Sequence, residues 1–154
     1  MPRHTENRNL PYTARQIYDL VADVARYPEF LPWTAAARVR SVRPLPDRSE
    51  GAEVMEADLV ISFKVFRERF GSRVTLLPAE GRIETEYLEG PFKHMQSSWD
   101  IRDRPEGGCA VRFHVDFEFR NALLAKIVGV VFDEAMRRVV GAFERRARAL
   151  YGAP

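Results

Sequence analysis

The sequence predicts an α+β fold in which a curved antiparallel sheet of about seven strands wraps around one long C-terminal helix. The clearest strand lies at residues 109–120, where apolar side chains alternate with mostly charged ones, so one face of the sheet is dry. The clearest helix lies at residues 122–150, which contain no proline and repeat apolar residues at helical spacing. Short connections rich in Pro and Gly favour antiparallel neighbours. The dry face needs a cover, and the long helix can provide it.

One strand and two short helices are expected ahead of the main run of strands. An edge strand is expected at residues 3–10. Thr13, followed three residues later by Gln16, forms a capping-box signature and predicts a helix that continues to about residue 25. Pro28 and Pro32 then allow only a short second helix. The other strands are expected at residues 36–44, 52–63, 65–77, 81–88 and 93–103.

Length and composition fit one domain spanning residues 1–154, which needs no metal or disulfide for stability. The 24 basic and 22 acidic residues leave a net charge of +2, too small for a dedicated nucleic-acid-binding protein, and no DNA partner is expected. Cys109 is the single cysteine, and the N-terminal residues lack the apolar run of a signal peptide, so we expect a cytoplasmic protein. No apolar stretch is long enough to span a bilayer.

Candidate catalytic and metal-binding groups are sparse. His4, His94, His114 and Cys109 lack the spacing of metal ligands. No nucleophile, phosphate-binding or dinucleotide motif is present. We therefore expect neither a metal site nor a catalytic residue.

Two groups of arginines allow more than one interpretation. Arg67, Glu68, Arg69 and Arg73 either form cross-strand ion pairs or hold a polar head group. The late part of the last helix carries Arg137, Arg138, Arg145, Arg146 and Arg148. This second group either faces solvent or contacts ribosomal RNA or anionic lipid head groups.

The first half of the last helix is apolar on every side apart from Lys126. Leu123, Ile127 and Val130 lie opposite the stripe expected to pack on the sheet, so another surface should cover them. The available segment is residues 30–33, Phe-Leu-Pro-Trp. Either the two pack together and close the core, or they form the rim of a lipid-accepting cavity or a membrane-facing patch. The stripe expected on the sheet is Ala125, Val128, Phe132, Met136, Val139, Phe143 and Leu150.

Several segments together resemble one family. They are residues 16–24 (QIYDLVADV), 27–33 (YPEFLPW), 66–70 (FRERF), 72–74 (SRV), 90–93 (GPFK), 115–119 (VDFEF) and 131–135 (VFDEA). On these segments the chain resembles the coenzyme Q-binding protein family of the START-like superfamily, whose fold is the helix-grip fold. Relatives of that family include ribosome-association toxins and polyketide cyclase or lipid-transport-like proteins. The chain departs from the family pattern at Thr34, where Cys is frequent, and at Gly71, where Thr or Ser is usual.

The resemblance implies a cavity between sheet and helix that holds ubiquinone or a related isoprenoid lipid, with no catalysis and no covalently bound cofactor. The protein would be a quinone carrier or chaperone that supports respiration or quinone biosynthesis, with peripheral contact at the inner face of the membrane. The alternatives are a ribosome-associated regulator that binds the large subunit and a polyketide cyclase or aromatase.

Candidate site residues follow from the apolar faces of these elements, and part of the set is expected to be ordinary core. The lipid-binding candidates are Phe30, Leu31, Trp33, Phe63, Phe66, Phe70, Trp99, Phe117, Val128, Val131, Phe132 and Met136. The candidates for a cavity rim or membrane contact are Pro32, Leu123, Ile127 and Val130.

Overall fold

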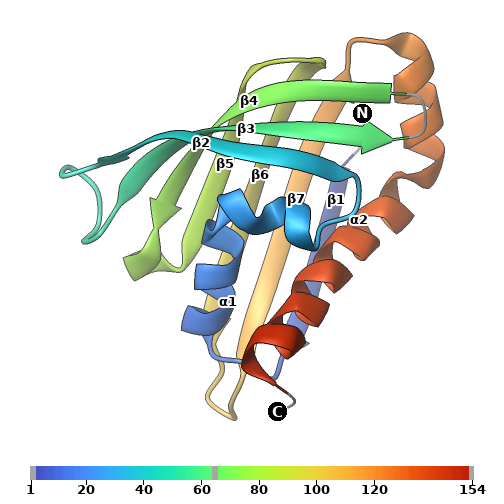
Figure 1. Ribbon diagram of the computed structural model, residues 1–154. Helices are drawn as coiled ribbons and strands as arrows, with labels where there is room; N and C mark the ends of the chain where they lie inside the picture. Colours follow the sequence, from blue (N-terminus) through green and yellow to red (C-terminus); the bar gives the residue numbers. More distant parts are fainter. Residues whose placement is uncertain (1–2, 64–65, 153–154) are drawn as a thin grey trace.

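The computed structural model describes residues 3–63 and 66–152, and of Phe66 it describes the backbone alone. The strands are β1 (Arg3–Leu10), β2 (Thr34–Pro44), β3 (Glu53–Phe63), β4 (Phe66–Leu77), β5 (Arg82–Glu89), β6 (Phe92–Asp103) and β7 (Cys109–Phe119). Within the described residues they form one seven-stranded antiparallel sheet in the order β1-β7-β6-β5-β4-β3-β2. The sheet is curved (Figure 1). The predicted fold class is confirmed, and the strand bounds differ from the expected ones by two residues or fewer.

Two short helices follow β1, as predicted. α1 (Ala14–Ala22) begins at the predicted capping box, where Thr13 Oγ1 accepts from the Gln16 N–H (3.1 Å) and Gln16 Oε1 accepts from the Thr13 N–H (2.9 Å). The helix ends before residue 25 because Asp23 leaves the helical backbone angles, and the 3-10 helix η1 (Val24–Glu29) continues the segment. The remaining helices are η2 (Pro78–Glu80) and α2 (Ala122–Tyr151).

α2 runs diagonally across one face of the sheet, in front of β7 and β1 in Figure 1. Phe132 of α2 is buried, as expected for a residue of the stripe that packs on the sheet. The expectation that Leu150 packs on the sheet is wrong, because this residue is 52% exposed. The last turns of α2 contact α1 instead, where the Tyr151 hydroxyl donates to the Gln16 carbonyl oxygen (3.0 Å). The buried face therefore turns toward Ala147, which is fully buried.

Aromatic side chains join the sheet to α2. The Trp99 ring of β6 lies 4.5 Å from Phe113 of β7 and 5.1 Å from Phe143 of α2, centroid to centroid. Phe117 of β7 contacts Phe132 of α2 edge-on at 4.9 Å. These contacts fall in the range that favours tilted and T-shaped ring pairs. The apolar alternation that predicted β7 therefore marks the face on which α2 packs.

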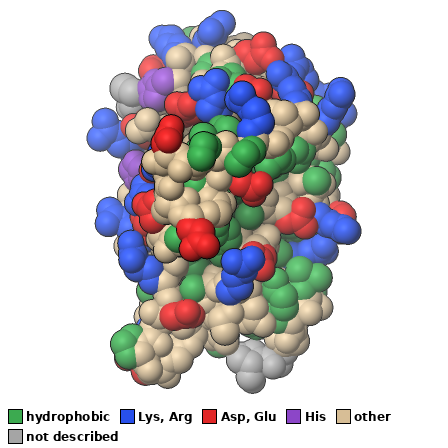
Figure 2. Space-filling view, turned by 90° about the vertical axis from the view of Figure 1, so that its left-hand side faces the viewer, with side chains coloured by type: hydrophobic (Ala, Val, Ile, Leu, Met, Phe, Trp, Pro, Cys, Tyr) green, Lys and Arg blue, Asp and Glu red, His purple; other side chains and the backbone are tan. Residues whose placement is uncertain are grey.

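Ion pairs cover the opposite face of β2, β3 and β4. Arg40 donates to Asp58 through two guanidinium nitrogens, Nε and Nη2, and Arg69 donates to the same carboxylate at 3.0 Å. The Arg40 hydrogen bonds hold the pKa of Asp58 below its usual value. Arg73 pairs with Glu86 of β5 at 2.9 Å. Of the two interpretations of this arginine group, cross-strand pairing is confirmed for Arg69 and Arg73. Basic and acidic side chains are likewise interspersed on the side of the molecule in Figure 2.

Candidate functional site

A cavity of about 290 Å³ lies between the sheet and α2. Its wall is almost wholly apolar, with Trp99, Phe113 and Phe117 on the sheet side and Val128, Val131, Ala135, Met136, Val139 and Phe143 on the α2 side. The segment that connects η1 to β2 closes a third side. The cavity exists because α2 touches the sheet through large rings at intervals and leaves space between them.

Most of the candidate residues chosen from the sequence lie on this wall. They are Leu31, Pro32, Trp33, Phe63, Phe70, Trp99, Phe117, Val128, Val131 and Met136. Pro32 was expected at the rim, and it lines the cavity beside Leu31 and Trp33. The side chain of Phe66 lies outside the described part of the structure.

Two candidates belong to the packed core and not to the cavity wall. Phe30 contacts Phe143 edge-on at 5.2 Å, with the Arg146 guanidinium 5.2 Å above its ring. Phe132 is 4% exposed and sits between Phe117 and the His4 ring. Both rings fill space where α2 approaches its neighbours closely, and neither is among the residues that line the cavity.

The polar members of the wall are few, and three of them donate a hydrogen bond to a backbone carbonyl oxygen. Ser72 Oγ donates to the Ala57 carbonyl oxygen at 3.4 Å, and Thr34 Oγ1 donates to the Pro32 carbonyl oxygen at 3.4 Å. The Tyr27 hydroxyl donates to the Val21 carbonyl oxygen, and burial raises its pKa. Glu68 has an exposed side chain. Among the described residues the wall contains no Lys, Arg, His or Cys.

Sequence reasoning missed Thr85 and Ser97, the two remaining polar residues of the wall. They occupy directly opposed positions on β5 and β6. The signal was available for Ser97, because Met95, Ser97 and Trp99 alternate along β6 and therefore share one face. A small polar residue in an otherwise apolar alternation indicates a special position on that face.

The first turns of α2 carry exposed apolar residues next to the cavity. Leu123 is 61% exposed, Val130 is 83% exposed and Val131, which also lines the cavity, is 40% exposed. Ile127 is half-buried, and Lys126 between them is exposed. The interpretation in which residues 30–33 cover this side of the helix is wrong for Leu123 and Val130. The exposed side chains of Leu123, Val130 and Val131 are called the apolar rim below.

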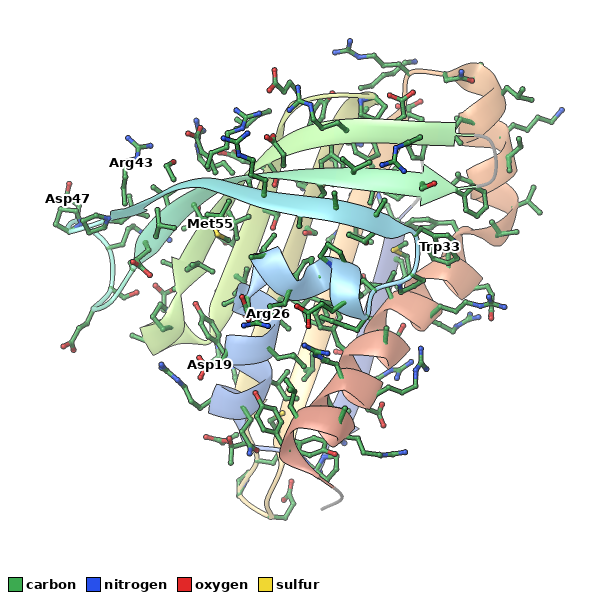
Figure 3. The ribbon with its side chains drawn as sticks, viewed as in Figure 1. Asp19, Arg26, Trp33, Arg43, Asp47 and Met55 are labelled. Atoms are coloured by element: carbon green, nitrogen blue, oxygen red, sulfur yellow. The ribbon has the colours of Figure 1, made fainter. Side chains whose placement is uncertain are left out.

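Trp33 stands at the end of β2 that faces α2 (Figure 3). Its φ of 61° lies in the left-handed region, which a bulky residue adopts only under constraint from its surroundings. The constraint comes from the Ser62 N–H, which donates to the Trp33 carbonyl oxygen at 2.8 Å, and from the Phe63 ring 5.8 Å away. The turn thereby holds an aromatic wall residue beside the first half of α2.

No cluster of three or more His, Cys, Asp or Glu side chains with the geometry of a metal site occurs within residues 3–63 and 66–152. In the same residues no helix is long and apolar enough to cross a bilayer.

A curved antiparallel sheet that grips a long C-terminal helix over an apolar cavity defines a START-like protein with the helix-grip fold. The chain belongs to the polyketide cyclase / dehydrase and lipid transport family, whose model matches residues 10–144. This bears out the superfamily that the sequence motifs indicated.

The chain is similar to three proteins along nearly its whole length. The ribosome association toxin RatA of Pseudomonas aeruginosa is 35% identical over 143 residues, covering 93% of each chain. The mitochondrial coenzyme Q-binding protein COQ10 homolog B of Xenopus laevis is 30% identical, covering 97% of this chain and 59% of that protein. The solution structure of an 18 kDa protein from Caulobacter crescentus superposes with a TM-score of 0.80 at 32% identity, covering 99% of this chain and 100% of that one.

Proposed function

We propose that this protein binds ubiquinone or a related isoprenoid lipid in the cavity and acts as a carrier or chaperone that supports respiration or quinone biosynthesis. The observation that carries the proposal is the apolar cavity of about 290 Å³ between the sheet and α2. Such a wall favours an apolar ligand by about 25 cal/mol for each Å² removed from water. The similarity to a coenzyme Q-binding protein supports the choice of a quinone.

The size of the cavity bears on how the ligand lies. Ligand sites usually enclose roughly 300–1,000 Å³, so about 290 Å³ holds a head group and only the beginning of a long isoprenoid tail. The rest of the tail must leave the cavity. The apolar rim of Leu123, Val130 and Val131 offers a path for it.

We further propose that the apolar rim touches the inner face of the cytoplasmic membrane while the protein itself stays cytoplasmic. An exposed cluster of apolar side chains on a helix favours insertion at the boundary between head groups and acyl chains. Lys126, on the same turns, adds attraction to anionic head groups. Contact at this place would let a lipid pass between the bilayer and the cavity.

We also propose that binding takes place without catalysis and without a covalently bound cofactor. Among the described wall residues the ionisable side chains are Tyr27 and Glu68. The raised pKa of Tyr27 keeps its proton in place, and Glu68 faces solvent. A quinone incubated with the protein is therefore expected to be recovered chemically unchanged.

The direct test is mass spectrometry of an organic extract of the purified protein, together with titration by a short-tailed benzoquinone. We expect an isoprenoid lipid in the extract and saturable binding in the titration. Absence of both would contradict the proposal.

A pair of matched variants tests the membrane contact. Val130→Glu places a charge on the apolar rim, and Leu150→Glu places the same charge on an exposed residue at the far end of α2. Only Val130→Glu should reduce flotation with anionic liposomes, and neither should change the melting temperature much, because both sites are exposed. Equal flotation of both variants and the wild type would remove the rim from the proposal.

Contact with the large ribosomal subunit is a second candidate function, which we propose because of the similarity to a ribosome association toxin. Arg137 and Arg138 pair with Glu134, but Arg145 and Arg148 are exposed and have no ion-pair partner in the described part of the chain. Co-sedimentation with large subunits, which should weaken as salt rises, tests this function. The double variant Arg145→Glu/Arg148→Glu should then stay in the supernatant.

A further inference from the structure

The hydroxyl groups of Thr85 and Ser97 form a polar spot inside the cavity. These residues are directly opposed on β5 and β6, and both line the cavity. Their neighbours in the same cross-strand row are Val74 and Val115, which also line it. Opposed side chains on one face of an antiparallel pair lie with their Cβ atoms about 4.5–5.5 Å apart, so both hydroxyls can reach one ligand group.

These two hydroxyls differ from the other hydroxyls of the wall because they have no hydrogen-bond partner among the described residues. Ser72, Thr34 and Tyr27 each donate to a backbone carbonyl oxygen, as described above. In the described residues neither Thr85 nor Ser97 makes a side-chain hydrogen bond to the protein. A polar group that faces an apolar cavity without a partner has hydrogen-bonding capacity left for a ligand.

The position of the pair indicates which end of a ligand it meets. The next wall residues along the two strands are Ile83 and Trp99, which are 3% and 6% exposed. The exposed side of the cavity lies instead at Val131, which is 40% exposed. Thr85 and Ser97, which are half-buried, therefore lie on the sheet side of the cavity, and the apolar rim of Leu123, Val130 and Val131 lies on α2.

The charge of the wall indicates the chemical class of the ligand head. No cationic side chain lines the cavity among the residues that the structure describes, and the one carboxylate is that of Glu68. A carboxylate or phosphate taken into such a site would be buried without a counter-ion, which is strongly unfavourable. Hydroxyl donors suit a neutral acceptor, such as a carbonyl or ether oxygen.

We propose that Thr85 and Ser97 form a head-group subsite that binds neutral lipids by donating hydrogen bonds to carbonyl or ether oxygens, with the head inward and the tail toward the apolar rim. This inference rests on the proposed lipid-binding function and deepens it. It excludes fatty acids and phospholipids as preferred ligands and admits quinones.

The test compares two double variants with the wild type. Thr85→Val/Ser97→Ala removes both hydroxyls from the cavity with little change in volume. Thr75→Val/Ser98→Ala makes the same chemical changes on the outer face, where the two residues flank Glu84 in the cross-strand row. Binding of a short-tailed benzoquinone is followed by quenching of the intrinsic fluorescence, since the protein has two tryptophans and both line the cavity.

Removal of both hydroxyls should weaken quinone binding by about tenfold to thirtyfold, and the outer-face variant should bind like the wild type. A hydrocarbon with the same tail and no head group, used as a competitor, should bind the wild type and Thr85→Val/Ser97→Ala equally. The wild type should prefer the quinone over a fatty acid of similar length at neutral pH, a comparison that needs no variant.

Two results would overturn the subsite: an unchanged quinone affinity in Thr85→Val/Ser97→Ala, or equal affinity of the wild type for fatty acid and quinone. Either result leaves lipid binding itself intact. If the wild type binds neither the quinone nor the hydrocarbon, the proposed function falls, and the subsite falls with it.

Discussion

Ala135→Leu should stabilise the protein, because Ala135 lines the cavity from the α2 side and a larger side chain there fills empty space. Leucine adds three carbon atoms, and burial contributes about 0.8 kcal/mol for each methylene-sized group. Ala135 is only partly buried, so the expected gain in the free energy of unfolding is about 1–2 kcal/mol. For a chain of this size that corresponds to a rise in Tm of roughly 2–8 °C. Quinone binding should weaken at the same time.

The matched control is Ala142→Leu on the same helix. Ala142 is 2% exposed and does not line the cavity, so the added atoms have no space and should destabilise the protein by about 1–3 kcal/mol. Thermal denaturation of both variants decides between a cavity and a packed interior. A loss of stability in Ala135→Leu equal to that in Ala142→Leu would refute the reasoning, and unchanged quinone affinity would place the ligand elsewhere.

Three further predictions concern other parts of the molecule. Asp58→Asn should lower the free energy of unfolding by about 1 kcal/mol, since the Arg40 pair is partly solvated. The lowered pKa of Asp58 means that this contribution is complete above about pH 4 and is lost as pH falls through the folded-state pKa, so urea denaturation of wild type and variant should converge in acid. Burial raises the pKa of Cys109 to about 11, so iodoacetamide at pH 8 should alkylate this thiol only after unfolding; rapid alkylation of the native protein would contradict its burial. Among the described residues the buried Tyr87 hydroxyl has no hydrogen-bond partner, so Tyr87→Phe should stabilise the protein by about 1 kcal/mol in thermal denaturation, and a lower Tm would contradict this reasoning.

Local chemistry was sufficient to predict the elements of the fold. The capping box of Thr13 and Gln16 placed the start of α1, because its hydrogen bonds involve residues three apart in sequence. Alternation from Cys109 to Phe119 placed β7, since successive side chains of any strand point to opposite faces. Neither inference requires knowledge of distant residues.

Prediction was weaker where distant parts of the chain decide the outcome. Leu150 lies on the apolar stripe of α2 by its spacing, yet it is exposed because the last turns of the helix meet α1 and not the sheet. Phe30 and Phe132 are phenylalanines, as several wall residues are, but their rings pack against other rings of the core and do not line the cavity. Arg146 was part of an expected basic surface, and it pairs at 2.8 Å with Glu29, far away in sequence.

The sequence by itself determined the order of the strands and helices, the dry face of the sheet and the apolar character of the first half of α2. The tertiary structure alone decided that the ring contacts between α2 and the sheet leave a cavity, with Thr85 and Ser97 on its wall. The physical reason is that secondary structure follows from contacts between residues close in sequence. A cavity depends instead on the separation of surfaces that belong to distant segments, and no single segment encodes that separation.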